Sequence, residues 1–213
     1  AIFIGMISYF IYFQMVKSES VINSSYNSRL DLYAEHVIRG DITTADGTVL
    51  AKTTVSDDGS ETREYPYGRM FAHVVGYTNN GKGGLESQYN FNLLRSHSFF
   101  LTQIINDLKN KKNIGDTLVT TLDYDVQETA YKALGDRDGA VVVMEVKTGK
   151  ILALVSKPDF DPNTLAERWD DIVSDENSSV LLNRVTSGLY PPGSTFKIFT
   201  TLEYGHENSN YQD

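Results

Sequence analysis

The sequence predicts an α+β fold that is preceded by part of a membrane-spanning helix. Three observations predict it: an uncharged apolar run at residues 1–16, β-prone runs joined by a tight turn between residues 37 and 55, and a capped helix followed by two apolar strands between residues 123 and 155. A length of 213 residues is typical of one or two domains. The hydrophobic share of 40% and the aromatic share of 11% are sufficient for a packed core.

The apolar run at the N-terminus, AIFIGMISYFIYFQMV, contains no charged side chain. As a helix it would span about 24 Å, which is less than the roughly 30 Å of a bilayer's hydrocarbon core. The aromatic residues between Tyr9 and Phe13 lie where an interfacial belt is expected. We therefore expect these residues to form part of a transmembrane anchor. A buried helix is the alternative, and a cleaved signal peptide is disfavoured because Lys-Ser-Glu-Ser follows the run.

The charge balance and the residue usage exclude several classes of function. The chain has 19 basic and 28 acidic residues, a net charge of −9, whereas nucleic acids are bound by clustered Lys and Arg. The absence of cysteine excludes disulfides, thiolate metal sites and a cysteine nucleophile. The four histidines show no metal-ligand spacing, and residues 135–139 lack the distal acid of a calcium loop. We expect neither a metal nor another cofactor.

Residues 17–114 are expected to form a polar connector followed by a mostly β region. Serine and asparagine clusters within residues 17–36 predict the connector. Strands at 37–43 and 48–55 flank Asp46-Gly47, and Asp-Gly between β-prone runs strongly indicates a hairpin. The further elements expected here are a turn, a glycine-rich loop and a short helix, at residues 56–60, 76–84 and 85–94 respectively.

Residues 115–213 show a tighter pattern of helices and strands. Asp123 is expected to cap a helix that runs through Leu134 and ends at Gly135. Two apolar strands should then form a hairpin of a central sheet, with Lys147-Thr148-Gly149-Lys150 as its turn. The remaining expected elements are a strand, a region of helical pattern and a helix, at residues 116–121, 164–187 and 194–204. In the last helix Phe196, Phe199 and Leu202 are placed for burial.

A nucleophile candidate lies at the start of this last helix. Ser194-Thr195-Phe196-Lys197 is an S-x-x-K tetrad that directly follows Pro191-Pro192-Gly193. A serine hydroxyl needs a base within hydrogen-bond reach, and positions i and i+3 share one face of a helix. The free N–H groups and the positive dipole end at a helix start favour an oxyanion and a neutral lysine. A neutral lysine is the form that a general base requires.

The tetrad alone is a weak signal, because a chain with 18 serines and 11 lysines produces this spacing by chance. An ordinary helix N-cap is the alternative role for Ser194. The wider string strengthens the catalytic interpretation, since Asn183-Arg184 and Tyr190-Pro191-Pro192-Gly193 precede the tetrad. This string resembles the active-site segment of the class B penicillin-binding proteins, the membrane-anchored D,D-transpeptidases of peptidoglycan synthesis, whose family motifs include S-x-x-K.

The resemblance extends over most of the chain. Arg39-Gly40-Asp41-Ile42, Asp46-Gly47 and Leu50-Ala51 are similar to the signature of the family's membrane-proximal domain. Later blocks of that domain are matched by Arg63-Glu64-Tyr65-Pro66, Val75-Gly76-Tyr77 and Gly84-Leu85-Glu86 with Tyr89. The opening of the transpeptidase domain is matched by Thr148-Gly149, Ile151-Leu152-Ala153, Pro158 and Phe160-Asp161-Pro162-Asn163. The blocks occur in the family's order, which makes the joint match specific.

The resemblance implies a transmembrane anchor at residues 1–16, a membrane-proximal pedestal domain at 17–114 and the first part of a transpeptidase domain, of the serine β-lactamase-like fold, at 115–213. It implies that Ser194 is the nucleophile, acylated by substrate or by β-lactams, and that Lys197 is its general base. It also implies peptidoglycan stem peptides ending in D-Ala-D-Ala as substrates. The cell membrane and a cell-wall glycosyltransferase would be partners, and most of the chain would lie outside the cytoplasmic membrane.

Two further family motifs, S-x-N and K-T-G, stand downstream of S-x-x-K in this family. Here Ser25-Tyr26-Asn27 and Lys147-Thr148-Gly149 both precede Ser194, and we expect both to be structural. Only sixteen residues follow Lys197, too few for the strand that should wall the active site. The chain therefore resembles an N-terminal piece of a transpeptidase, which we expect to be inactive by itself.

Two other interpretations remain open from the sequence. The chain could act as a non-catalytic, membrane-anchored pedestal that binds partners through residues 17–114. It could also belong to a serine β-lactamase or a β-lactam sensor, which share the S-x-x-K motif. The long region before Ser194 disfavours a lone β-lactamase.

Overall fold

The computed structural model describes residues 2–17, 21, 36–97, 106 and 111–208. At the N-terminus α1 (Ile2–Tyr12) continues into a π-helical turn, η1 (Phe13–Lys17). No residue of α1 is buried, so no part of the described chain covers it. Among the described residues, no helix combines the length and the apolar character needed to cross a bilayer.

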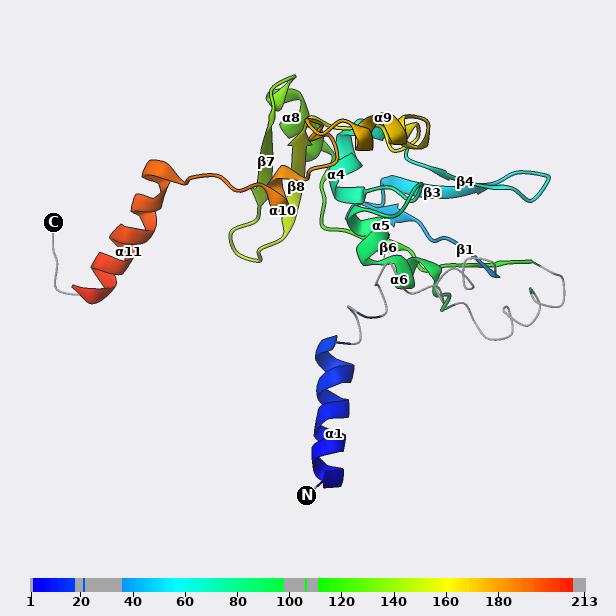
Figure 1. Ribbon diagram of the computed structural model, residues 1–213, viewed down its shortest axis with the longest axis horizontal. Helices are drawn as coiled ribbons and strands as arrows, with labels where there is room; N and C mark the ends of the chain where they lie inside the picture. The colour runs from blue at the N-terminus through cyan, green and yellow to red at the C-terminus, as the bar shows by residue number, and fades with distance from the viewer. Residues whose placement is uncertain (1, 18–20, 22–35, 98–105, 107–110, 209–213) are drawn as a thin grey trace.

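A small sheet forms the centre of the first region (Figure 1). Its strand order is β4-β3-β2-β6, with bounds β2 (Ile42–Thr43), β3 (Val49–Val55), β4 (Glu61–Glu64) and β6 (Leu118–Val119). Strands β2 and β3 are antiparallel across the predicted turn, where Gly47 has a φ of 91° that favours glycine. The hairpin is therefore confirmed. Strand β6 adds to β2 in parallel and is shorter than the strand expected at residues 116–121.

The strand expected at residues 37–43 is interrupted. Its first part, β1 (Val37–Ile38), pairs in parallel with β5 (Asn113–Ile114), and only the second part, β2, joins the larger sheet. The interruption lies at Gly40, whose N–H donates to the Leu93 carbonyl at 2.8 Å. A Cβ at this position would lie 2.0 Å from the Asp116 carbonyl oxygen, so the close approach of these backbones requires glycine.

Short helices cover this sheet and complete its core. They are η2 (Gly68–Phe71), α4 (Ala72–Val75), α5 (Gly84–Gln88) and α6 (Asn90–Leu94). The single helix expected at residues 85–94 is thus two helices, divided at Tyr89, where φ is −108° and ψ is 23°. The buried core side chains are Ile42, Leu50, Ala51, Tyr65, Phe71, Val75, Leu93 and Leu122.

The second region begins with α8 (Tyr124–Leu134) and the hairpin of β7 (Gly139–Met144) and β8 (Ile151–Lys157). The Asp123 carboxylate accepts from the Val126 N–H at 3.0 Å, which confirms the predicted cap. The face of α8 that includes Val126, Ala130 and Leu134 packs on the hairpin, where Ala130 is buried against Ala153 and Val155. The hairpin is antiparallel and, in the described residues, forms a two-stranded sheet rather than part of a larger central one.

The region of helical pattern at residues 164–187 is mostly irregular. It contains only η3 (Leu165–Arg168), α9 (Trp169–Ser174) and α10 (Arg184–Ser187). Phe160, Leu165 and Ile172 are buried together with Ala72 of α4. Because Ala72 belongs to the first region, this cluster packs the two regions against each other.

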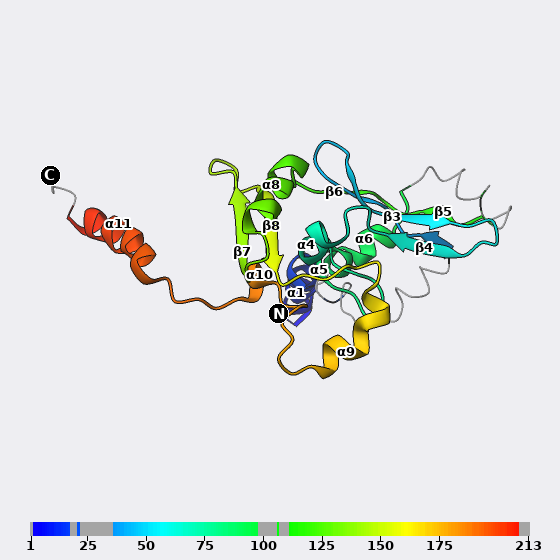
Figure 2. The same ribbon diagram turned by 90° about the horizontal axis from the view of Figure 1, so that it is seen from above.

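The C-terminal helix lies apart from the rest of the molecule in both views (Figures 1 and 2). It consists of a 3-10 turn, η4 (Gly193–Phe196), and α11 (Lys197–Glu207). The expected burial of Phe196, Phe199 and Leu202 is wrong for this chain, because these side chains are 53%, 65% and 67% exposed. The physical reason is that no other described element packs against η4 or α11.

Candidate active site

The S-x-x-K tetrad lies where the sequence predicts, at the start of the last helix. The 3-10 turn η4 contains Ser194, and Gly193 enters it with a φ of 54°, a conformation that favours glycine. The Thr195 hydroxyl and N–H both donate to the Pro192 carbonyl, which fixes this turn against the preceding prolines. The local sequence alone thus shapes the backbone around Ser194.

Ser194 and Lys197 are adjacent along the helix but are not hydrogen-bonded through their side chains. The Lys197 N–H donates to the carbonyl oxygens of Ser194 and Thr195, which continues the 3-10 turn into α11. Both residues are exposed. Within the described ranges, no hydrogen bond joins Ser194 Oγ to Lys197 Nζ. The segment provides the i, i+3 spacing of a nucleophile and a base. No other described residue covers these two side chains and excludes water from them.

The upstream K-T-G sequence forms a turn between two strands. Gly149, with a φ of 75°, donates from its N–H to the Glu145 carbonyl at 2.9 Å, and the Thr148 hydroxyl donates to the Glu145 carboxylate. These contacts close the β7–β8 hairpin and involve no residue of η4 or α11. The prediction that Lys147-Thr148-Gly149 forms the turn of this hairpin is confirmed. Ser25-Tyr26-Asn27 lies outside the described residues.

The described residues offer no evident metal centre. No group of three or more His, Asp or Glu side chains among them is placed to hold a metal ion. His97 pairs with Asp116, and His73 contacts the Pro158 carbonyl at 3.0 Å through Nε2. These two histidines therefore take part in pairwise contacts within the fold.

Two family models match successive parts of the chain. Residues 39–118 match the penicillin binding protein A dimerisation domain, and residues 139–208 match the penicillin binding protein transpeptidase domain. The second match includes Ser194 and Lys197, and together the two cover more than two thirds of the chain. The chain belongs to the class B penicillin-binding proteins. The resemblance seen in the sequence is thereby confirmed.

Relatives of known name agree with this assignment. The chain is 38% identical over 190 residues to the peptidoglycan D,D-transpeptidase PbpA of Mycolicibacterium smegmatis, a match that covers 81% of this chain and 38% of that protein. The D,D-transpeptidase domain of a peptidoglycan glycosyltransferase from Eggerthella lenta is 37% identical, with a TM-score of 0.65 over 78% of this chain and 36% of that one. Penicillin-binding protein A from M. tuberculosis, solved as an imipenem acyl-enzyme complex, is 33% identical, with a TM-score of 0.70 over 78% and 42% of the two chains. The chain therefore spans about two fifths of the length of these relatives.

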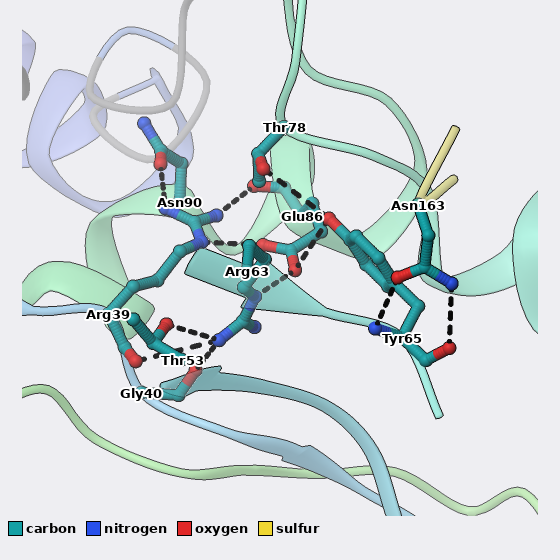
Figure 3. Close-up of polar contacts among 9 residues, drawn as sticks. All are labelled: Arg39, Gly40, Thr53, Arg63, Tyr65, Thr78, Glu86, Asn90 and Asn163. Carbon is teal, nitrogen blue, oxygen red and sulfur yellow. Dashed lines mark hydrogen bonds and ion pairs between the residues drawn. The ribbon is translucent and has the colours of Figure 1, made fainter. Parts of the chain in front are cut away.

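Several family motif residues of the first region form a buried ionic cluster (Figure 3). Glu86 of α5 is fully buried, and its carboxylate accepts from Arg39 Nε at 2.5 Å and from Arg63 Nε at 2.8 Å. Arg39 also donates to the Asn90 amide oxygen and to the Glu86 carbonyl, and its burial lowers its pKa. Tyr65 OH lies 3.4 Å from the same carboxylate, and burial raises the pKa of its phenol. The cluster brings together β4, α5, α6 and Arg39, which directly follows β1.

Asn163 connects this cluster to the second region, because its side-chain amide forms two hydrogen bonds with the backbone of Tyr65. Its amide oxygen accepts from the Tyr65 N–H at 2.9 Å, and its amide nitrogen donates to the Tyr65 carbonyl at 3.0 Å (Figure 3). Asp161 accepts from both the backbone and the side-chain amide of Asn163, which orients that side chain. The motif Asp161-Pro162-Asn163 thus binds the backbone of a motif almost a hundred residues earlier.

Two further polar residues join the two regions, a role that the sequence did not predict for either of them. Gln127 of α8 is fully buried, donates to the Met70 and Leu154 carbonyls at 2.7 and 2.9 Å, and accepts from the Leu154 N–H at 2.8 Å. Asn183 caps α10 and donates to the His73 carbonyl at 3.0 Å. Gln127 lies three residues before Ala130, on the same buried side of α8. A glutamine beside buried apolar positions was the feature of the sequence that could have indicated this role.

Proposed function

We propose that this chain belongs to a peptidoglycan D,D-transpeptidase and supplies its membrane anchor (1–16), its pedestal (17–114) and the first part of its catalytic domain (115–213). The observation that carries the proposal is the match of the transpeptidase model to residues 139–208, the segment that includes the S-x-x-K tetrad. The naming of PbpA as a D,D-transpeptidase and the acyl-enzyme complexes of M. tuberculosis penicillin-binding protein A support the same reaction class.

In the proposed reaction Ser194 Oγ attacks the carbonyl carbon of the penultimate D-Ala of a stem peptide. Lys197 Nζ accepts the hydroxyl proton as the new C–O bond forms. The peptide C–N bond then breaks, the terminal D-Ala leaves with that proton on its amine, and an acyl-serine ester remains. The amine of a neighbouring stem peptide attacks the ester and releases Ser194, which completes the cross-link. A β-lactam would acylate Ser194 through its ring amide and block the second step.

The base role requires Lys197 to be neutral when the substrate is bound. A protonated ammonium cannot accept a proton, so a lysine that acts as a base must be desolvated or placed near positive charge. In this chain Lys197 is exposed, and the walls that would desolvate it are not formed by residues 36–97 or 111–193. The proposal therefore assigns the S-x-N, the functional K-T-G and the second oxyanion donor to further parts of a longer protein.

The membrane anchor is part of the proposal. Helix α1 exposes apolar side chains on all sides, including Ile2, Phe3 and Phe10 at 79%, 79% and 64%. A helix that is apolar all round is stable in a membrane or a protein interior, and none of its side chains is buried by described residues. With this anchor, residues 17 onward would lie outside the cytoplasmic membrane, and residues 17–114 would be the part available to a glycosyltransferase partner. Carbonate extraction of native membranes should leave the protein in the pellet, and recovery in the supernatant would contradict the anchor.

The catalytic proposal is tested by labelling the protein, expressed from its complete reading frame, with a fluorescent penicillin. Ser194→Ala should abolish the labelled band. Lys197→Ala should slow acylation by about 10²–10⁴-fold, the usual contribution of a general base. Lys147→Ala is the matched control, because it removes a lysine from the other K-T-G sequence and should leave labelling unchanged. Undiminished labelling of Ser194→Ala would overturn the assignment, as would loss of labelling in a folded Lys147→Ala protein.

A further inference from the structure

Residues 183–197 run from the start of α10 to the end of the S-x-x-K tetrad, and we refer to them as the nucleophile arm. Beyond α10 the arm leaves the body of the molecule in both views (Figures 1 and 2). Leu189 is 97% exposed and Tyr190 is 61% exposed. The hydrogen bonds that join the arm to β8 and α4 are made at its first two residues, Asn183 and Arg184.

Ser156 of β8 holds the start of the arm from the second region. Ser156 is only 2% exposed. Its hydroxyl donates to the Leu182 carbonyl at 3.1 Å and accepts from the Arg184 N–H at 3.0 Å. One buried hydroxyl thus fixes the backbone on both sides of Asn183. Its removal would leave both backbone groups without this partner, which is unfavourable away from water.

Asn183 holds the same point from the first region. Its Nδ2 donates to the His73 carbonyl of α4 at 3.0 Å. Its Oδ1 accepts from the Val185 N–H at 3.0 Å and from the Thr186 N–H at 3.4 Å, which caps α10. The two atoms of one amide group therefore have separate tasks, because Oδ1 begins the helix and Nδ2 binds it to the first region.

Local contacts stiffen the arm between this fixed point and Ser194. Helix α10 supplies one hydrogen-bonded turn. The Tyr190 ring then lies against the α-carbon of Gly188, where a Cβ would be 2.5 Å from a ring carbon. Two prolines follow, whose rings restrict φ, and the 3-10 turn that contains Ser194 begins directly after them. A shift at residues 182–184 would therefore be carried along the arm.

We propose that Ser156 and Asn183 are positioning residues for the nucleophile. They fix the start of the arm against β8 and α4, and the stiff arm carries that position to Ser194 Oγ. The inference rests on the proposed function, because it assumes that Ser194 is acylated. It adds that the first region, through the His73 carbonyl, helps to place a side chain of the catalytic domain. Misplacement of a reacting atom by about 1 Å can lower a rate by about 10²-fold.

The time course of acylation by a fluorescent penicillin, measured over a range of concentrations on the protein from its complete reading frame, tests the proposal. It separates the dissociation constant of the non-covalent complex from the acylation rate constant. Asn183→Ser retains a residue type that caps helices, but its shorter side chain cannot also reach the His73 carbonyl. Ser156→Ala removes only the hydroxyl. Each substitution should lower the acylation rate constant at least about tenfold and leave the dissociation constant nearly unchanged.

Asn163→Ser is the matched control, since it also removes amide hydrogen bonds between the two regions but lies outside the arm. It should leave the acylation rate constant of the folded protein unchanged. A merely structural role of Ser156 and Asn183 would lower the melting temperature and the fraction of protein that is labelled, with a wild-type rate constant for that fraction. This outcome would overturn the proposal. An equal loss of rate in Asn163→Ser would also overturn it, because it would show a general loosening of the junction.

Ser194→Ala separates this test from the test of the proposed function. If the Ser194→Ala protein is still labelled, the proposed function fails and the positioning inference fails with it. If Ser194→Ala abolishes labelling while Asn183→Ser and Ser156→Ala are acylated at the wild-type rate, only the positioning inference fails.

Discussion

The ionic cluster around Glu86 and the segment around Ser194 differ in nearly every physical respect. Glu86 is fully buried, bound by two arginines and joined to a second region through Tyr65 and Asn163. Ser194 lies on an exposed turn whose hydrogen bonds are all local. Both belong to motifs of the same family. The comparison shows that some motif residues hold this fold together, while others need surroundings that the described chain does not provide.

The contrast also explains why the i, i+3 spacing of Ser194 and Lys197 does not by itself establish their catalytic roles. The backbone around Ser194 is shaped by Pro191, Pro192 and Gly193, but a base with a suitable pKa and an oxyanion site depend on burial and on fixed donors. The Glu86 cluster shows what such surroundings do, because burial there lowers the pKa of Arg39 and raises that of Tyr65.

The largest expected effect is the loss of the Glu86 charge. Glu86→Gln should reduce the free energy of unfolding by about 3–5 kcal/mol, because Arg39 and Arg63 would remain buried without a counter-ion. Glu64→Gln is the control: its partner Lys52 lies 3.3 Å away, and both side chains are more than 40% exposed. This change should leave the free energy of unfolding nearly unchanged, because exposed ion pairs contribute little. Denaturant unfolding of both variants measures the difference, and equal effects would contradict the structural role of the cluster.

A pair of leucines compares the two regions through packing alone. Leu93 of α6 is fully buried, whereas Leu202 of α11 is 67% exposed. In this 213-residue chain Leu93→Ala should lower the free energy of unfolding by about 2–5 kcal/mol, through lost burial and the cavity left behind. Leu202→Ala should change it by less than about 0.5 kcal/mol. A large destabilisation by Leu202→Ala in denaturant unfolding would show that α11 packs against another part of this chain.

The smallest expected effect concerns the pH dependence of the junction between the regions. Burial lowers the pKa of His73, whose Nε2–H donates to the Pro158 carbonyl and whose ring packs edge-on against Phe160. The nearby charged groups are Asp159, which opposes this shift, and Arg184, which adds to it. The folded state therefore favours the neutral imidazole, and the unfolded state binds the proton more readily.

The sign of the effect follows from this difference in proton binding. The contribution of His73 to stability is fully present above the unfolded pKa of about 6.5 and is lost as the pH falls from there toward the lower folded value. The free energy of unfolding should therefore fall across this range as the pH is lowered. His73→Asn should remove that part of the pH dependence. An unchanged pH profile in the variant would show that other groups cause it.

The elements that the sequence predicted well are those with local causes. The hairpins at Asp46-Gly47 and Lys147–Lys150 and the helix between Asp123 and Gly135 depend on turn and cap residues within a few positions of one another. The backbone of the S-x-x-K segment belongs to the same class. The catalytic roles of Ser194 and Lys197 remain predictions.

The elements that the sequence did not predict depend on contacts between distant residues. The strand expected at 37–43 is divided because Gly40 packs against Asp116, and the role of Glu86 arises only when α5 meets β4 and the residue after β1. Phe196, Phe199 and Leu202 are apolar as burial requires, but their burial needs a partner surface that no described element supplies. Periodicity indicates which face of a helix is apolar, and it does not indicate what covers that face.

The most direct test of the account is to locate the β-lactam adduct. The protein from its complete reading frame, treated with penicillin G and digested, should show by mass spectrometry a single peptide increased by the mass of the whole β-lactam. We expect that peptide to contain Ser194, with fragmentation placing the added mass on its side chain. An adduct on Ser25 or on any other serine, with Ser194 unmodified, would contradict the assignment of Ser194 as the nucleophile.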